Sequence, residues 1–144
     1  MSKKMDMFKD VLRRDGNDHL FKDEEQDILV GKITLNDKGE TSVTVLLNLD
    51  DESFDNTIEI LIKSIEFQKK YKALELVNEL SKKYKNGNYY LWENDDNTLS
   101  FWRNDVYTAS LEEFKPDDLN LILMRALESI EKEDIVEIMR LVWA

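Results

Sequence analysis

The chain has 144 residues and a formal net charge of −11, with 42% hydrophobic residues, a single histidine and no cysteine. This length and hydrophobicity predict one domain, residues 1–144, that folds around its own core and is not disordered. The absence of cysteine excludes disulfides and cysteine-ligated zinc and fits a cytoplasmic location, and no apolar stretch approaches the roughly 20 residues of a membrane span.

The charge is unevenly distributed along the sequence. Residues 15–60 hold thirteen carboxylates against three lysines, whereas residues 1–14 hold five cations and two carboxylates. A field of this sign repels nucleic-acid phosphates and anionic lipid head groups. We therefore expect a protein partner, with no direct binding to nucleic acid and no membrane partner.

The chain begins with a predicted helix over residues 3–14, in which apolar residues recur at helical spacing. Gly16 is expected to end this helix with a positive φ. Residues 18–27 are polar and acidic and predict a loop anchored by Leu20 and Phe21.

Three strands are predicted next, over residues 28–35, 41–49 and 57–67. The second alternates apolar and polar residues, as a half-buried antiparallel strand does, and the third is rich in β-branched residues. Asn36–Gly39 predicts a hairpin turn with glycine where φ turns positive. Residues 50–56 predict a second loop.

An amphipathic helix over residues 68–85 is predicted to follow, with Gly87 just beyond its end. Residues 89–92 and 98–107 then predict the two strands of a hairpin, joined by a turn of Asn and Asp residues.

Two helices end the predicted order, over residues 119–130 and 133–142, with Pro116 at the start of the first. We expect Trp143, which follows them, to be tucked into the core; the alternative is that it is offered to a partner. The order α-βββ-α-ββ-αα predicts an α+β fold with one antiparallel sheet. Helices are expected on one face and the other face is expected to be partly exposed or paired.

No motif selects a catalytic, cofactor or metal site. His19 is the sole imidazole and lies in a polar segment, and the sequence has no G-x-S-x-G motif. The four glycines are isolated from one another, so no phosphate-binding loop is predicted. The carboxylates of Asp50–Asp55 lack the glycine of a calcium loop. We therefore expect no enzymatic activity, no catalytic residue, no cofactor and no metal.

Aromatic residues crowd the predicted hairpin over residues 89–107. Strand alternation sends Tyr90 and Trp92 to the face opposite Tyr89, and either the chain's own helices or a partner must cover the exposed set. The partner-binding candidates are Tyr90, Trp92, Trp102 and Tyr107.

The segment that contains this hairpin also resembles a known family. Residues 71–80, followed by Asn86-Gly87-Asn88-Tyr89-Tyr90-Leu91-Trp92 and Thr98–Trp102, resemble the YbjN-like family, in which a helix runs into an N-G-x-[FY]-Y strand. The resemblance implies the type III secretion chaperone-like fold, α-β-β-β-α-β-β-α, from which this chain departs by an extra helical segment at residues 133–143. It also implies a dimeric, acidic adaptor or chaperone-type protein without catalytic residues.

The sequence thus predicts a non-enzymatic, bacterial, cytoplasmic protein-binding module, adaptor-like or chaperone-like, that acts as a homodimer on a polypeptide partner. The alternative is an acidic inhibitor, for example one encoded by a phage, whose carboxylates mimic nucleic acid and block a DNA-binding enzyme. Salt separates the two, because a charge mimic loses its target steeply as ionic strength rises.

Overall fold

The computed structural model describes residues 2–37, 39–84 and 87–144. The strands are β1 (Phe21–Glu25), β2 (Ile28–Thr34), β3 (Ser42–Asn48), β4 (Asp55–Glu66), β5 (Gly87–Glu93) and β6 (Thr98–Thr108). The helices are α1 (Lys3–Arg14), α2 (Lys70–Ser81), α3 (Pro116–Ser129) and α4 (Ile135–Val142), with a π-helical turn, Ile130–Asp134, between the last two.

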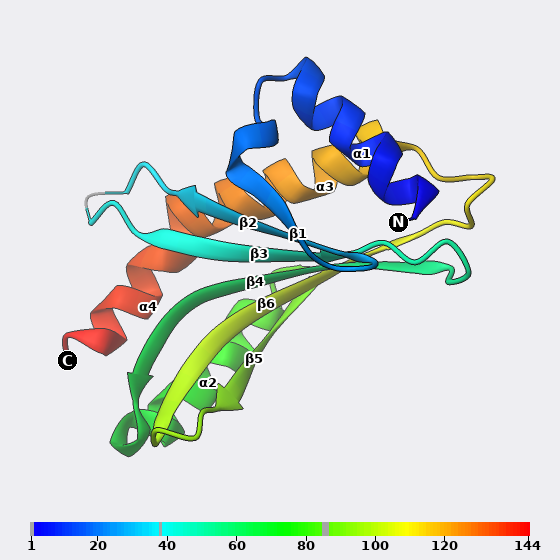
Figure 1. Cartoon of the computed structure of the whole chain (residues 1–144). Coiled ribbons are helices and arrows are strands. Elements are labelled where there is room, and N and C mark those ends of the chain that lie inside the picture. The colour runs from blue at the N-terminus through cyan, green and yellow to red at the C-terminus, as the bar shows by residue number, and fades with distance from the viewer. Residues whose placement is uncertain (1, 38, 85–86) are drawn as a thin grey trace.

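The strands form one antiparallel sheet in the order β1-β2-β3-β4-β6-β5. The helices pack against one face of this curved sheet, as Figure 1 shows. The predicted α+β class with a single antiparallel sheet is confirmed, whereas the type III secretion chaperone-like fold stays a prediction. Within the described residues, no helix has the length and apolar character needed to span a bilayer.

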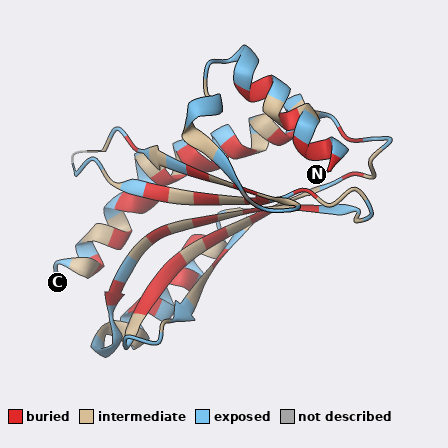
Figure 2. Ribbon diagram, in the orientation of Figure 1, coloured by how far each residue is buried: buried red, intermediate tan, exposed pale blue. Residues whose placement is uncertain are grey.

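Period-two alternation builds the core in the central strands. Every second side chain of β3, and of β4 as far as Ile62, is buried, as the alternating bands in Figure 2 show. Val45, Leu47, Ile58 and Ile60 have no exposed area, and residues of all four helices join them in one apolar cluster. The intervening side chains of these strands face away from the helices.

The prediction of a loop over residues 18–27 is wrong, because β1 occupies half of this segment. β1 pairs with β2, with Phe21 opposite Gly31, and the Phe21 ring fills the space that a Cβ of Gly31 would need. The ring also meets Phe8 edge to face, at 6.4 Å between centroids. An edge strand can be charged because one of its sides meets water, so β1 lacks the alternation by which strands are recognised.

Gly16 ends α1 as predicted, with a φ of 74°. In the hairpin predicted at Asn36–Gly39, the positive φ belongs to Glu40 (46°), so the predicted role of the glycine is wrong. Lys38 of this turn lies outside the described residues.

Gly87 does not lie at the end of a helix as predicted. α2 ends at Ser81, and residues 85–86 lie outside the described part of the chain. Gly87 is the first residue of β5 and pairs with Asp105 of β6. A Cβ at this position would overlap the Asp105 carboxylate, so the glycine permits a close approach of the two strands.

We expect Gly87→Ala to lower the free energy of unfolding by about 1–3 kcal/mol, because the new methyl group displaces a buried carboxylate. Urea denaturation measures the change. Gly39→Ala is the matched control, since its new Cβ makes an ordinary contact, 3.6 Å from an oxygen of Asp37. Equal losses in the two variants would contradict the assigned role of Gly87.

A buried lysine fastens the start of α1 to one end of the sheet. Lys4 has no exposed area, and its ammonium group donates to the carbonyl oxygens of Asp50 (3.0 Å), Ser53 (2.7 Å) and Ala109 (3.0 Å) and to Oδ1 of Asn56 (2.9 Å). One cation therefore joins the β3–β4 loop to the end of β6.

We expect Lys4→Met to lower the free energy of unfolding by about 2–4 kcal/mol, because the buried acceptors lose their donor. Burial lowers the pKa of Lys4, and the charges of Asp51 and Asp50 oppose this shift. Lys3→Met, at an exposed neighbouring position, is the control and should leave the urea midpoint nearly unchanged. A Lys4→Met protein as stable as the control would show that the lysine does not fasten α1.

Candidate protein-binding surface

The face of the sheet away from the helices carries three of the four candidate side chains. β5 and β6 place Tyr90 directly opposite Trp102, and the two rings stack with centroids 6.2 Å apart and planes 6° from parallel. Trp92 lies on the same face and is 62% exposed. Tyr89 points to the opposite face and is buried, so the predicted alternation of Tyr89 and Tyr90 is confirmed.

The aromatic stack belongs to a row of side chains that crosses five strands. The pairing register places Lys32, Thr44, Leu61, Trp102 and Tyr90 side by side on β2, β3, β4, β6 and β5. A second row beside it runs through Val30, Leu46, Glu59 and Asn104.

We term this surface the open face. Its members include Lys22, Val30, Lys32, Thr44, Leu46, Glu59, Leu61, Tyr90, Trp92, Trp102, Asn104 and Val106. Its apolar and aromatic members outnumber its three charged members, Lys22, Lys32 and Glu59, whose formal charges sum to +1. Burial and the charge of Glu59 raise the pKa of Tyr90, so the phenol stays neutral.

Tyr107, the fourth candidate, lies elsewhere. It is an odd number of residues from Trp102 on the same strand, so its side chain points to the helix side. The ring packs on Phe114 with centroids 5.8 Å apart, and its hydroxyl accepts a hydrogen bond from the Lys115 backbone (3.2 Å). Tyr107 thus supports the β6–α3 connection and is not a member of the open face.

A buried polar cluster lies behind the stack, on the helix side of β6, and sequence reasoning missed it. Arg103 is 4% exposed and donates to the Asp105 carboxylate at 2.8 and 3.2 Å. Its guanidinium also lies over the Tyr84 ring, 4.1 Å from the centroid. Asp134 of the π-helical turn has no exposed area and accepts hydrogen bonds from the hydroxyls of Tyr84 (2.8 Å) and Tyr89.

This cluster ties the aromatic hairpin to the helices. Its charges and hydroxyls face one another, and Arg103 Nη1 lies 3.7 Å from Asp134 Oδ2. Within the described residues, no group of three metal-ligating side chains lies close enough to hold an ion. The cluster therefore fixes the position of β5 and β6 from the helix side of the sheet. In the sequence, the local indication of this cluster is that Arg103 and Asp105 are two residues apart and so share one face of a strand.

The outer edge of β5 is closed by α2. The hydroxyl of Ser81 accepts from the Tyr89 amide (2.8 Å) and donates to the Tyr89 carbonyl (3.3 Å), which satisfies backbone groups that an edge strand would otherwise expose. A strand of another protein therefore cannot pair with β5 at Tyr89.

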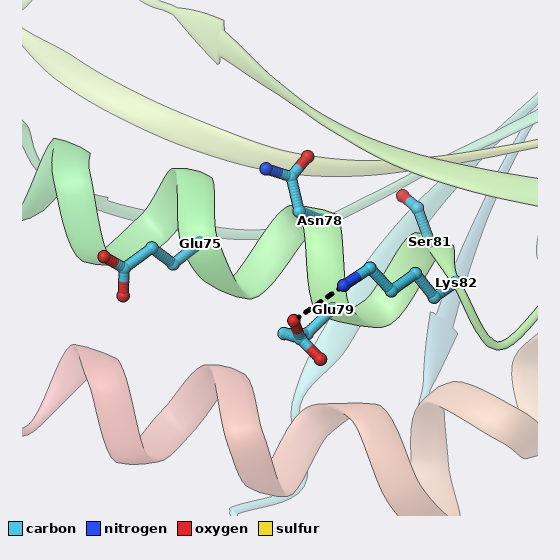
Figure 3. A pocket seen from close by; sticks show the side chains of 5 residues that line it. All are labelled: Glu75, Asn78, Glu79, Ser81 and Lys82. Atoms are coloured by element: carbon cyan, nitrogen blue, oxygen red, sulfur yellow. Dashed lines mark hydrogen bonds and ion pairs between the residues drawn. The ribbon is translucent and has the colours of Figure 1, made fainter.

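A hollow of about 610 Å³ lies beside the same helix. The side chains that line it are Glu75, Asn78, Glu79, Ser81 and Lys82, all on or just after α2, as Figure 3 shows. Glu79 and Lys82 form an ion pair across it (3.1 Å), and Ser81 is engaged with β5. These five side chains do not form a nucleophile with an adjacent general base.

Comparison with known proteins identifies no relative: no family model, no curated protein and no solved structure matches the chain. The resemblance to the YbjN-like family therefore stays a prediction.

The two phenols that bond to Asp134, half-buried Tyr84 and buried Tyr89, predict a loss of stability in alkali. Burial and the Asp134 carboxylate raise the pKa of Tyr84 to about 12, and that of Tyr89 rises further. In the unfolded chain both phenols ionise near pH 10. Between pH 10 and 12 the folded state thus holds more protons, so the free energy of unfolding falls as pH rises.

Urea denaturation between about pH 8 and 12 measures this dependence. We expect Tyr89→Phe to be less stable than wild type at neutral pH and to lose less stability on going to alkaline pH. Tyr71→Phe, at a position that is 83% exposed, should keep the wild-type slope. A wild-type slope in Tyr89→Phe would show that this phenol does not resist ionisation in the fold.

Proposed function

We propose that the protein is a non-enzymatic protein-binding module that acts as a homodimer on a polypeptide partner, and that two copies meet through the open face. The observation that carries the proposal is the stacked Tyr90–Trp102 pair beside an exposed Trp92, on a sheet face that no described helix covers. Tryptophan and tyrosine are the residues that most often anchor protein interfaces.

The apolar character of the open face supports an interface. Leu61 adjoins the stack on β4, and Leu46 and Val30 continue the apolar surface across β3 and β2. All three side chains are only half-buried by their own sheet. A contiguous apolar surface of this kind in an otherwise charged protein marks a contact site.

The charge of the chain favours a second copy as the occupant of this face. Two chains of net charge −11 repel each other through most surfaces. The open face holds two lysines and one glutamate, so contact through it brings few of the carboxylates together. Two such sheets can stack about 10 Å apart with their strands at about −30°, as in β-sandwiches.

Behind the face, the Arg103–Asp105–Asp134 cluster supports the same proposal. It holds the hairpin in one position before any partner arrives, which lowers the entropy lost on association.

The acidic-inhibitor alternative stays a prediction. It is distinguished by the steep salt dependence that binding of a charge mimic to its target would show.

The test combines a double variant with a matched control. We expect the Trp92→Ser, Trp102→Ser variant to keep the far-ultraviolet circular dichroism of the wild type and to dimerise at least about tenfold more weakly in sedimentation equilibrium. The Phe54→Ser, Tyr71→Ser variant removes two aromatic rings that are 65% and 83% exposed elsewhere, and it should dimerise as wild type.

Thr44→Lys provides a second test, because it introduces a charge into the same cross-strand row without removing a ring. It should also dissociate the dimer. An unfolded double variant would show that the two tryptophans are structural. A Thr44→Lys protein that dimerises as wild type, or a wild type that is monomeric at about 100 μM, would overturn the dimer through this face.

A further inference from the structure

α4 is apolar on two sides. Its inner side, Ile135, Ile138 and Leu141, is buried in the core. On its outer side Val136 is 46% exposed and Trp143, one residue beyond the helix, is 76% exposed. The expectation that Trp143 is tucked into the core is therefore wrong: it follows Val136 at helical spacing, and the inner side is already filled.

The outer side of α4 forms one wall of a groove. A hollow of about 440 Å³ is lined on this side by Val136, Met139 and Trp143. The rest of its lining includes Asp37 of the β2–β3 turn and Glu131 of the π-helical turn. We term this hollow the α4 groove. It lies on the helix side of the sheet, so it is separate from the open face.

The backbone at Trp143 is held in place, and its side chain is exposed. The ammonium group of Lys69 donates to the last carbonyls of α4, those of Leu141 (3.0 Å) and Val142 (2.7 Å). The Trp143 amide donates to the Met139 carbonyl (3.1 Å). The position of the exposed indole is thus set by a backbone that is already ordered, so less main-chain freedom is left to lose on binding.

The rim of the α4 groove is anionic. Burial of Asp37 is more than offset by the hydrogen bonds it accepts from the Thr41 amide (2.7 Å) and hydroxyl (2.8 Å), so its pKa lies below the ordinary value. Glu131 adds a second carboxylate, which accepts a hydrogen bond from the backbone of the turn. Among the described residues, the cation in this lining is Arg140, and Glu137 pairs with it at 2.9 Å.

We propose that the α4 groove binds a short segment of a partner polypeptide in which apolar side chains stand next to lysine or arginine. The apolar wall receives the apolar side chains, and the carboxylates at the rim attract the cations. A second copy of this chain is a poor occupant, because it brings a net charge of −11 to an anionic rim. This inference rests on the proposed function only in that both involve a protein partner.

The probe is a fluorescein-labelled peptide of about 12 residues built from leucine and lysine, with leucine–glutamate and lysine–glycine peptides of equal length as references. The fluorescence anisotropy of each labelled peptide is measured as the 144-residue chain is added, at about 0.15 M salt, where weak surface attraction is screened. We expect the leucine–lysine peptide to bind and both references to bind at least about tenfold more weakly.

Trp143→Ala should weaken binding of the leucine–lysine peptide by about tenfold or more. Tyr71→Ala, which removes a comparably exposed aromatic ring from α2, should leave it unchanged. Equal affinities in wild type and Trp143→Ala, or equal binding of the lysine–glycine peptide, would overturn the α4 groove as a docking site.

Sedimentation of the same variants separates this inference from the proposed function. Trp143→Ala should remain a dimer, and the Trp92→Ser, Trp102→Ser variant should keep the peptide affinity per chain. If the double variant loses the peptide while Trp143→Ala retains it, the segment docks on the open face and the α4 groove inference fails. If the chain is monomeric yet binds the peptide through Trp143, the dimer fails and the α4 groove stands.

Discussion

All the helices in the described chain pack against the same face of one sheet, and this constraint decides which surfaces remain for partners. The protein has two layers, so the second face of the sheet has no cover of its own. A water-facing sheet would ordinarily alternate apolar and polar residues cleanly. Here Leu61, Trp102 and Tyr90 lie side by side on the uncovered face, which is the basis of the interface we propose.

β6 connects the two sides of the molecule through consecutive residues. Trp102 points to the open face, whereas Arg103 points into the buried cluster with Asp105 and Asp134. Removing one member of such a cluster leaves an uncompensated buried charge, which is strongly destabilising. The aromatic stack is thus held by polar contacts on the other side of the sheet. A displacement of Asp134 in the π-helical turn would move Arg103, and with it the neighbouring residue Trp102 on the open face.

Much of the fold followed from local periodicity, and the exceptions have physical causes. The central strands and the Tyr90–Trp102 pairing depend on period-two alternation, which the sequence displays directly. β1 was missed because a charged edge strand does not alternate. Trp143 was misplaced because α4 is apolar on two sides, so its composition does not identify the buried one. Arg103 and Asp134 were missed because charged residues read as exposed until distant partners are known.

The buried ammonium of Lys4 has a consequence for the order of events during synthesis. Its partner carbonyl on Ala109 lies 105 positions later in the sequence. α1 leaves the ribosome before β6, yet it cannot complete the burial of this charge until the end of β6 has emerged and reached the loop after β3. The docking of α1 therefore waits for a contact of high sequence separation, between Lys4 and the residue that follows β6.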